Sequence, residues 1–378
     1  MELSEIRKQI NSIDDQILAL FLDRMDLSAK VAEYKRENNL PILDRGRERE
    51  IIARLTAAAG DKERWVYRLY STIMELSRAS QAAITGASGE VYEQIKKTLE
   101  NEHPLFPETG SVACQGTEGG NSQLACDKLF PRGNLMYVKS FESVFEAVEC
   151  GLCRFGVLPI ENSSNGSVRA VYEQLLKHNV SVVRSTRLCI RHELMALPGA
   201  KLSGIRKIFS HEQALGQCSK YLSGLSGVQI IPCDNTAVAA KTVSQSGDTS
   251  LAAIASHSCT ELYGLKCLND EIQNSDNNYT RFICITRGNE MYAGAGRISL
   301  VISCDNKPGS LYDILAKFQA LGLNMTKLES CPVTGRNFEF IFILEIEASI
   351  RTPEVAGMLS ELERSCRSFR LLGCYAEV

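Results

Sequence analysis

The chain has 378 residues, of which 44% are hydrophobic and 23% charged, and its formal net charge is −3. The length predicts two to three domains, and the composition is ordinary for a globular protein. The weak charge predicts no nucleic-acid or membrane-surface partner, so an anionic substrate is expected to need individually placed cations. No apolar run approaches the ~18 residues of a membrane span, and the charged N-terminus is unlike a signal peptide. A cytoplasmic location is therefore expected.

The cysteines and histidines give no sign of a metal site. The fourteen cysteines are scattered beside apolar residues, which favours buried thiols over disulfides in a cytoplasmic chain. Cys150 and Cys153 have CxxC spacing, but no second pair accompanies them. None of the five histidines has metal-ligand spacing with cysteines or carboxylates. The sequence therefore predicts no metal and no cofactor.

The first element is a long amphipathic helix, predicted from about residue 4 to about residue 37. Its apolar seam recurs at steps of three and four residues. The seam comprises Ile6, Ile10, Ile13, Ile17, Leu20, Leu27 and Val31. A helix of ~50 Å cannot bury this seam within a monomeric module of residues 1–85, so a homodimer or larger homo-oligomer is expected.

Cations occupy unusual positions on this helix. Arg24 lies in the seam, where the pattern requires an apolar residue. Lys35 follows after close to three turns and shares its face. Arg7 lies on a different face and ~25 Å from Arg24, so it is expected to serve the partner subunit's site. Extension of the side chains from the helix surface would explain either Arg24 or Lys35 alone.

Two further helices are predicted in this module. The second has Asp44 as its expected N-cap, with Arg47 and Glu48 in its first turn. The apolar face of the third helix ends in two polar residues, Ser77 and Gln81, at successive i+4 steps. Polar side chains on a buried face need hydrogen-bond partners.

These positions together resemble the all-helical chorismate mutase family, whose active site lies in a dimeric helical bundle. The resemblance rests on Arg7, Arg24, Lys35, Asp44, Arg47, Glu48, Ser77 and Gln81. It implies that the arginines hold the two carboxylates of chorismate. It also implies that Lys35 and Gln81 donate to the breaking ether oxygen and that Glu48 contacts the hydroxyl, which makes these three the expected catalytic residues. Such a rearrangement needs a reactive conformer and charge stabilisation, not a nucleophile.

The composition and periodicity of the chain change after the mutase domain, which is expected to span residues 1–90. Residues 91–108 run from polar residues into prolines and are expected to form a linker. Residues 109–290 alternate short apolar runs with helical patterns, which predicts an α/β domain. The glycine-rich turn at 115–122 suggests anion binding at a helix N-terminus, although it is neither a P-loop nor GxGxxG.

Several predicted strands of this domain end in polar residues at the next helix start. Ligands of open α/β sheets bind at the carboxyl ends of the strands, so a polar cleft suited to carboxylates is expected there. N-capping alone would explain the Ser and Asp residues at these ends. It would not explain Gln115, Asn162 or Gln213.

The segment Asn278-Tyr279-Thr280-Arg281-Phe282 resembles the signature of prephenate dehydratases. Further matches cover essentially all of the α/β domain, at 115–122, 156–166, 210–218 and 235–240. The resemblance implies two α/β lobes with the active site in the cleft, as in bacterial solute-binding proteins. Thr280 is then the expected acid that assists loss of the ring hydroxyl, and Arg281 pairs with a carboxylate or holds the loop. The implied prephenate site comprises Ser122, Asn162, Ser163, Ser210, Gln213, Thr280 and Arg281.

Residues 297–378 are expected to form a small ferredoxin-like α+β domain with the order βαββα. Two of its segments, around Gly309 and around Asn324, resemble the phenylalanine-contacting motifs of ACT regulatory domains. This implies a phenylalanine site at an interface between two ACT domains, built from Gly309, Leu311, Asn324, Glu329 and Ser330. Tyr312 and Cys331 depart from the usual residues of those motifs. A domain used only for dimerisation is the alternative.

The sequence thus favours a bifunctional enzyme of phenylalanine biosynthesis. Chorismate would become prephenate in the helical module, and prephenate would become phenylpyruvate, CO2 and water in the α/β domain, with phenylalanine as effector. The alternative is a non-catalytic amino-acid sensor with a helical dimerisation arm. Arg24 in the seam and Thr280 in the signature favour the enzyme.

Overall fold

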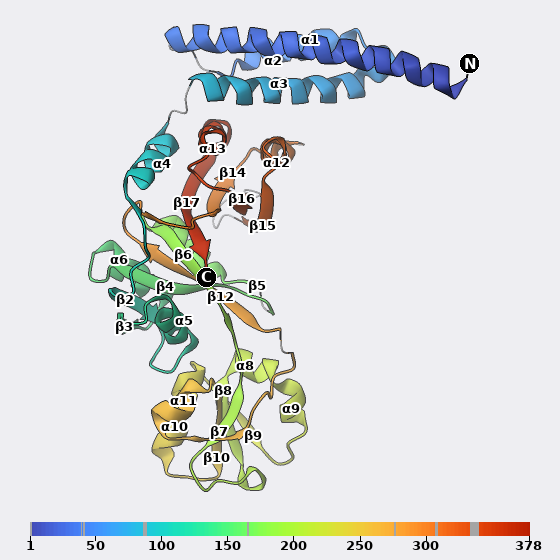
Figure 1. The fold of residues 1–378 in the computed structure, drawn as a ribbon. Helices are drawn as coiled ribbons and strands as arrows, with labels where there is room; N and C mark the ends of the chain where they lie inside the picture. Colours follow the sequence, from blue (N-terminus) through green and yellow to red (C-terminus); the bar gives the residue numbers. More distant parts are fainter. Residues whose placement is uncertain are drawn as a thin grey trace. The chain divides into compact units, whose positions relative to one another are not determined.

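A computed structural model describes residues 2–38, 40, 42–85, 89–164, 166–275, 277–306, 309–332 and 340–378. The chain divides into two compact units (Figure 1). One comprises Met1–Glu100 with Arg297–Leu371, and the other comprises Asn101–Gly296 with Leu372–Val378. Two segments distant in sequence thus form each unit.

The N-terminal part of the first unit is built from helices (Figure 1). They are α1 (Leu3–Glu37), α2 (Arg45–Ala57), a 3-10 turn (Gly60–Lys62), α3 (Glu63–Thr85) and α4 (Glu90–Glu100). Helix α3 packs against both α1 and α2. The predicted long helix is confirmed by α1, and the predicted N-cap of α2 is confirmed because the Asp44 carboxylate accepts from the Arg47 amide.

The apolar seam of α1 is exposed in the single chain. Ile10, Ile13 and Ile17 are 50, 54 and 56% exposed. Only Ser28 and Ala32 of α1 are buried, and both lie in its C-terminal half. The fold of one chain therefore leaves most of the seam without a packing partner. Exposed apolar surface of this extent is unfavourable in water.

The segment expected to be a linker contains a helix. Val91, Ile95 and Thr98 of α4 are buried, and α4 packs against α13 (Pro353–Ser365). The spacing of these three residues places them on one face. The expected linker of residues 91–108 is therefore ordered over much of its length, because α4 has an apolar face that the other helix buries.

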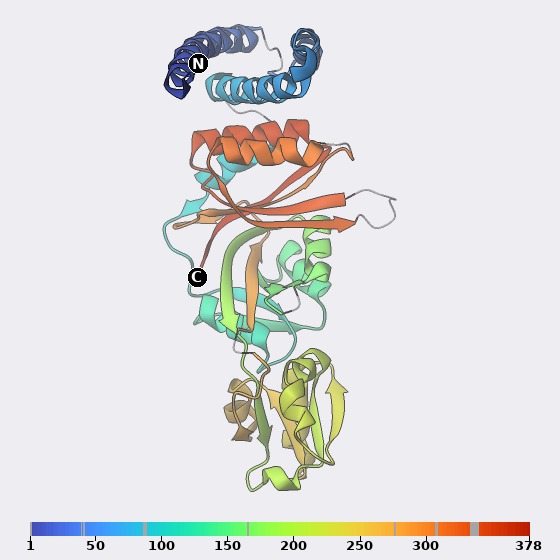
Figure 2. The same ribbon diagram turned by 90° about the vertical axis from the view of Figure 1, so that its right-hand side faces the viewer.

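The C-terminal part of the first unit is an α+β layer structure. Its elements are β14 (Arg297–Ser303), α12 (Ser310–Ala320), β15 (Asn324–Pro332), β16 (Phe340–Glu347), α13 and β17 (Ser368–Glu377). The strand order is β15-β16-β14-β17, and α12 and α13 cover one face of the sheet (Figure 2). The expected order βαββα was wrong by one strand. The buried residues of β17 occur in pairs, so it lacks the alternation that predicts a strand.

The second unit consists of two α/β lobes. The first lobe has the strand order β17-β6-β12-β4-β2-β3, with residues 372–378 of β17 at its edge. Its elements are β2 (Ser111–Gln115), α5 (Asn121–Leu129), β3 (Asn134–Val138), α6 (Phe141–Glu149), β4 (Phe155–Asn162), β5 (Gly166–Ser167), α7 (Arg169–Lys177), β6 (Ser181–Cys189) and β12 (Tyr279–Thr286). Beside it, β1 (Glu102–His103) pairs with β13 (Met291–Tyr292). The aromatic residues Phe130, Phe155 and Phe282 fill its core.

The second lobe is inserted between β6 and β12. Its strand order is β11-β7-β10-β8-β9. Its elements are β7 (Glu193–Ala196), a 3-10 turn (Leu202–Gly204), β8 (Lys207–His211), α8 (Glu212–Gln217), α9 (Ser219–Ser223), β9 (Gln229–Cys233), α10 (Thr236–Ser246), β10 (Leu251–Ala255), α11 (Ser258–Tyr263) and β11 (Lys266–Asn269). The predicted two-lobed α/β domain is confirmed. The chain enters this lobe after β6 and leaves it before β12.

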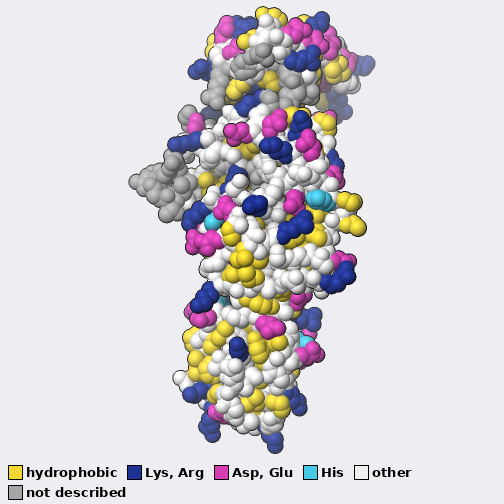
Figure 3. Space-filling view, turned by 90° about the vertical axis from the view of Figure 1, so that its left-hand side faces the viewer, with side chains coloured by type: hydrophobic (Ala, Val, Ile, Leu, Met, Phe, Trp, Pro, Cys, Tyr) yellow, Lys and Arg dark blue, Asp and Glu magenta, His cyan; other side chains and the backbone are white. Residues whose placement is uncertain are grey.

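The surface and the cysteines add three observations. On the face seen in Figure 3, the coloured Lys, Arg, Asp and Glu side chains of both signs are interspersed. Among the described residues, no helix is long and apolar enough to cross a membrane, and no group of three or more His, Cys, Asp or Glu could hold a metal ion. All fourteen cysteines are free thiols.

Candidate active sites

A cavity of about 500 Å³ lies between the lobes of the second unit. Its walls come from the ends of strands and the starts of the following helices, as the sequence predicts. Four of the predicted prephenate residues line it, namely Ser122, Asn162, Gln213 and Thr280. The remaining polar lining includes Gln115, Thr117, Asn121, His192, His211, Gln217, Asp234, Asn235 and Thr236.

Thr280 and Asn162 meet because β12 runs antiparallel to β4 with these two residues in register. The Asn162 amide Nδ2 donates to the Thr280 hydroxyl oxygen over 2.9 Å. A hydroxyl carries one donor hydrogen and two acceptor lone pairs. Since its oxygen accepts from Asn162, the hydrogen of Thr280 remains available as a donor on a residue that lines the cavity.

A chain of hydrogen bonds continues from this pair. Asn162 Nδ2 also donates to Asn278 Oδ1 (3.0 Å), and Asn278 Nδ2 donates to Gln217 Oε1 (3.0 Å). The ring nitrogen Nε2 of His192 lies 2.8 Å from the same Gln217 oxygen. Burial lowers the pKa of His192, so the neutral ring with its hydrogen on Nε2 is the donor. Asn162 Nδ2 lies 3.3 Å from the Tyr279 carbonyl as well, so the hydrogen-bond chain is also tied to the backbone of β12.

Sequence reasoning missed Gln217, Asn278 and His192 as site residues. Gln217 lies one helical turn after Gln213, and Asn278 lies two residues before Thr280, so both positions could have been found from the element periods. A single buried histidine has no such signal, because its role depends on which side chain the fold brings to it.

Three predicted prephenate residues do not line the cavity. The Ser163 hydroxyl donates to the Asn277 carbonyl and accepts from the Tyr279 amide, both over 2.9 Å. The buried Ser210 hydroxyl donates to the Ile254 carbonyl over 2.6 Å. These serines bind the backbone of neighbouring segments and so hold the shape of the cleft.

Arg281 also lies outside the cavity lining. Successive side chains of a strand point to opposite faces, so Arg281 faces away from the side on which Thr280 and Phe282 line the cavity. Its buried guanidinium lies 3.2 Å from a Glu161 carboxylate oxygen and 3.8 Å from one of Glu377. Arg281 therefore pairs with carboxylates of the protein itself, and its expected role toward prephenate stays a prediction.

The cavity lacks the placed cations that were expected for an anionic substrate. Among the described lining residues there is no Lys or Arg. The glycine-rich turn leads into the N-terminus of α5, and Asn235 caps α10 at another wall. A helix N-terminus carries roughly half a positive charge together with unpaired N–H groups. Helix N-termini therefore provide positive potential at this cavity, whereas Arg281, the cation expected in the prephenate site, is not among its lining residues.

The mutase residues meet on the facing sides of α1 and α3. The Arg24 guanidinium donates to the Ser77 hydroxyl over 2.5 Å, and Gln81 Nε2 donates to the Ser28 hydroxyl over 2.9 Å. Ser77 and Gln81 are 5 and 8% exposed. The prediction that these two buried polar residues have partners is confirmed.

The other mutase positions lie around this face. Lys35 Nζ donates to the Ile42 carbonyl over 2.5 Å. Asp44 caps α2, and the exposed Arg47 pairs with Glu50 over 2.9 Å. Arg7 is exposed near the other end of α1, ~25 Å along the axis from Arg24. One chain therefore does not bring Arg7 to the remaining residues.

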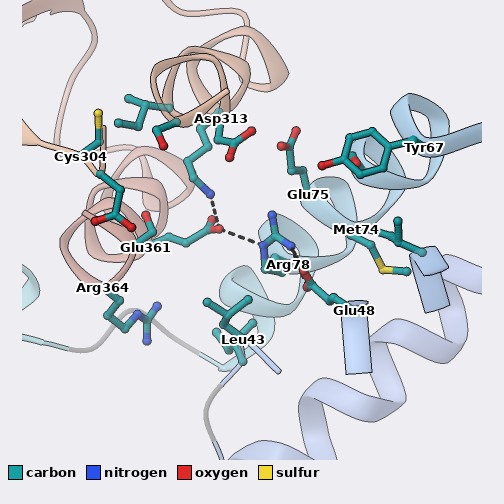
Figure 4. A pocket seen from close by; sticks show the side chains of 18 residues that line it. Leu43, Glu48, Tyr67, Met74, Glu75, Arg78, Cys304, Asp313, Glu361 and Arg364 are labelled. Carbon is teal, nitrogen blue, oxygen red and sulfur yellow. Dashed lines mark hydrogen bonds and ion pairs between the residues drawn. The ribbon is translucent and has the colours of Figure 1, made fainter. Parts of the chain in front are cut away.

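Glu48 is held by a residue that the sequence did not single out. The Arg78 Nη1 atom donates to both Glu48 carboxylate oxygens, over 2.7 and 2.6 Å (Figure 4). Arg78 follows Ser77 directly, so its Cα position points to a different face of α3. Only the packing of α2 against α3 identifies it as a neighbour of the mutase residues.

The residues predicted to bind phenylalanine lie on two elements, α12 and β15. Gly309 is the N-cap of α12 with φ 91°, a left-handed conformation that favours glycine, and Leu311 lies in the first turn. Asn324, Glu329 and Ser330 lie on β15, which is the last strand of its sheet. Exposed and half-buried residues alternate along this strand, and no other strand among the described residues pairs with its outer edge.

Comparison with known proteins supports both catalytic regions. The family model for chorismate mutase type II matches residues 6–82, and that for prephenate dehydratase matches residues 112–290. The bifunctional chorismate mutase/prephenate dehydratase of Escherichia coli K12 is 30% identical over 382 residues, covering 99% of this chain and 96% of that protein. The chain belongs to this bifunctional family. Its enzyme assignment is thereby confirmed, and the alternative of a non-catalytic sensor is wrong.

Two solved structures share the fold of a large part of this chain. The prephenate dehydratase of Arthrobacter aurescens in complex with L-Phe is 26% identical, with a TM-score of 0.65, covering 70% of this chain and 89% of that chain. GqqA, described as a novel type of quorum quenching acylase, is 29% identical with the same TM-score, covering 71% of this chain and 98% of its own. The shared fold therefore hosts more than one named activity.

Proposed function

We propose that the mutase converts chorismate to prephenate on the α1–α3 face, with Arg24, Lys35 and Gln81 nearest the reacting bond. The observation that supports this is the meeting of Arg24, Ser77 and Gln81 on facing helix sides. The rearrangement breaks a C–O bond and forms a C–C bond without proton transfer. Lys35 and Gln81 donate to the ether oxygen, where negative charge develops, and Arg24 holds a carboxylate. The same chain also contributes four further residues to the site, Asp44, Arg47, Glu48 and Ser77.

A homodimer supplies what one chain lacks. The exposed seam of α1, with Ile13 and Ile17 more than half exposed, provides the apolar surface for a second copy of the helix. Because Arg7 lies ~25 Å from Arg24, it reaches the partner subunit's site and not its own. Each site then contains residues of two chains.

The dehydratase reaction takes place in the cleft of the second unit. Thr280 donates its hydrogen to the departing ring hydroxyl, which leaves as water. The bond to the ring carboxylate breaks at the same time, CO2 leaves, and its electron pair completes the aromatic ring of phenylpyruvate. Thr280 recovers its hydrogen from solvent. The direction of the hydrogen bond between Asn162 and Thr280 supports this proposal. Asn162 is the donor, so the hydroxyl hydrogen of Thr280 remains available.

A threonine hydroxyl is a weak acid, and two features offset this. Aromatisation and loss of CO2 provide driving force, so a well-placed donor is sufficient. The chain through Asn162, Asn278 and Gln217 fixes the rotation of that donor. The N-termini of α5 and α10 hold the carboxylates of prephenate.

The C-terminal α+β region acts as an ACT regulatory domain that binds phenylalanine. Its βαββαβ order supports this proposal, as does the L-Phe complex of the Arthrobacter aurescens protein. The ligand is held by Gly309, Leu311, Asn324, Glu329 and Ser330, between two copies that meet at the open edge of β15. The domains accordingly span residues 1–90, 109–290 and 297–378, in a cytoplasmic enzyme whose cysteines are free.

One experiment tests these proposals together. Purified protein is given chorismate, and chorismate loss and phenylpyruvate formation are followed with and without phenylalanine. Loss of chorismate followed by phenylpyruvate, with both slowed by phenylalanine, is expected. Turnover that phenylalanine leaves unchanged would overturn the regulatory proposal and leave both active sites standing.

A further inference from the structure

The carboxylate of Glu48 belongs to a network of ion pairs that extends into the C-terminal region of the first unit. Arg78 of α3 holds both Glu48 oxygens through Nη1, and its Nε lies 3.3 Å from Glu361 of α13. Glu361 in turn accepts from Lys317 of α12. Four helices therefore contribute one charge each, in alternating sign (Figure 4).

The network is shielded from water. The side chains of Arg78 and Glu361 are each 15% exposed, that of Lys317 is 10% exposed, and that of Glu48 is 23% exposed. These residues line a cavity of about 630 Å³ between α2, α3, α12 and α13. Ion pairs at such sites are screened less by salt than exposed pairs. Removing one member of a buried pair leaves the other without compensation.

The surroundings of the network are acidic. Glu75 of α3 and Asp313 of α12 line the same cavity, and burial raises the pKa of both carboxyl groups, against the opposing effect of nearby Arg78 and Lys317. Burial alone would lower the pKa of Arg78, but the hydrogen bond and charge of Glu48, with the charge of Glu361, raise it. Arg78 and Lys317 thus line one cavity together with several carboxyl groups, of which Glu48 and Glu361 contact them directly.

We propose that Arg78 is a positioning residue for Glu48 in the mutase site, and that Glu361 and Lys317 of the C-terminal region fix the position of Arg78. This rests on the proposed role of Glu48 toward the substrate hydroxyl. Each carboxylate oxygen has more than one lone pair, so Glu48 can accept from Arg78 and from a substrate hydroxyl at once. Arg78 determines where those remaining lone pairs point.

The consequence is a mutase whose efficiency depends on a residue outside its own domain. Replacement of Glu361 by glutamine removes the negative charge that anchors the Nε side of Arg78, while the direct Arg78–Glu48 ion pair remains. A misplaced catalytic group lowers the rate even when the change lies far from the reacting atoms. The expected effect falls on the mutase reaction, because neither Glu361 nor Lys317 lines the dehydratase cavity.

The test is a double-mutant cycle in the full-length protein, with kcat and KM measured for both reactions. Arg78→Met is expected to lower mutase kcat/KM about 10-fold and Glu361→Gln about 3-fold to 10-fold. The double variant should be no worse than Arg78→Met alone, because Glu361 acts only through Arg78. Dehydratase parameters, measured with prephenate on the same preparations, should stay within about 2-fold of wild type, which reports that the second unit is intact. Unchanged helical circular dichroism should report intact folding of the helices of the first unit.

Two controls make the outcome decisive. Glu354→Gln makes the same charge change at an exposed position of α13 and should leave the mutase unchanged. Glu48→Gln tests the proposed function itself. If Glu48→Gln is inactive while Glu361→Gln behaves as wild type, or if the effects of Arg78→Met and Glu361→Gln simply add, the inference is overturned and the active-site proposal survives. Full mutase activity of Glu48→Gln would overturn the role of Glu48 on which the inference rests.

Discussion

The proposed mutase face of the first unit and the proposed dehydratase cleft of the second unit offer positive charge to a substrate by different means. On α1, Arg24 and Lys35 present full positive charges on long side chains. In the cleft, the described lining contains amides, hydroxyls, two histidines and helix N-termini, with no Lys or Arg. The mutase reaction needs charge at a breaking C–O bond and no proton. The dehydratase reaction needs one correctly oriented hydrogen.

The two regions also differ in what one chain can complete. Asn162, Asn278 and Thr280 meet within a single domain, because β12 and β4 lie side by side. The mutase face leaves its apolar seam exposed and Arg7 distant from the other residues. The cleft brings its neutral donors together within one domain, where they can be aimed at developing charge. Under the proposed function, a helical surface that is open in one chain depends on strong charges and on a second subunit.

The largest expected effect is the loss of dehydratase activity when the hydroxyl group of Thr280 is removed. Thr280→Val keeps the shape of the side chain and removes the donor, so dehydratase activity should fall about 10²-fold to 10⁴-fold. Mutase activity should be unchanged. Phenylpyruvate formation from prephenate measures the first effect, and chorismate loss measures the second.

Thr280→Ser is the matched control, because it restores the hydroxyl. It should recover most of the dehydratase activity. A serine variant as inactive as the valine variant would show that the hydroxyl is not the donor.

The next largest effect is loss of the mutase reaction while the dehydratase reaction is retained. Lys35→Ala should lower mutase activity about 10²-fold to 10³-fold, because it removes a charged donor from the developing oxyanion. Dehydratase activity with prephenate should persist. Lys30→Ala, at an exposed position of the same helix, should affect neither reaction. If Lys35→Ala and Thr280→Val each abolished both reactions in folded protein, the assignment of two sites would be wrong.

A smaller effect tests the shared mutase site. Arg7→Ala and Lys35→Ala chains, each nearly inactive alone, are co-expressed with equal yields. Random pairing in a two-fold dimer leaves about a quarter of the sites with both residues intact, so about a quarter of wild-type mutase activity should return. Activity no higher than that of the separate variants would show that Arg7 and Lys35 do not complete a site across two chains.

The smallest expected effect concerns His192, which ends the hydrogen-bond chain in the dehydratase cleft. Burial lowers its pKa below the ordinary value of 6.5, so the unfolded chain takes up this proton at a higher pH than the folded protein. Stability from the neutral ring is therefore present above pH 6.5 and is lost as the pH falls below it. Urea unfolding at pH 7.5 and 5.5 should show a larger loss of unfolding free energy for wild type than for His192→Gln. Equal losses would mean that His192 does not remain neutral in the folded protein.

Local patterns in the sequence determined a large part of this protein. The three-and-four spacing of isoleucines and leucines determined α1, and an aspartate before a helical run determined the cap of α2. The strand-to-helix boundaries that carry Ser122, Asn162 and Gln213 followed from alternation and turn residues. Each of these depends on neighbours within a few positions, and sequence periods report such neighbours directly.

The tertiary structure alone decided which of these residues work together. The register of β12 against β4 places Thr280 on Asn162, 118 residues away, and turns Arg281 to the opposite face. Packing of α4 on α13 converts an expected linker into a helix, and packing of α2, α3, α12 and α13 joins Glu48 to Glu361 through Arg78. Lone residues such as His192 and Arg78 carry no periodic signal, because their partners come from distant elements. Their roles arise only when the chain has folded.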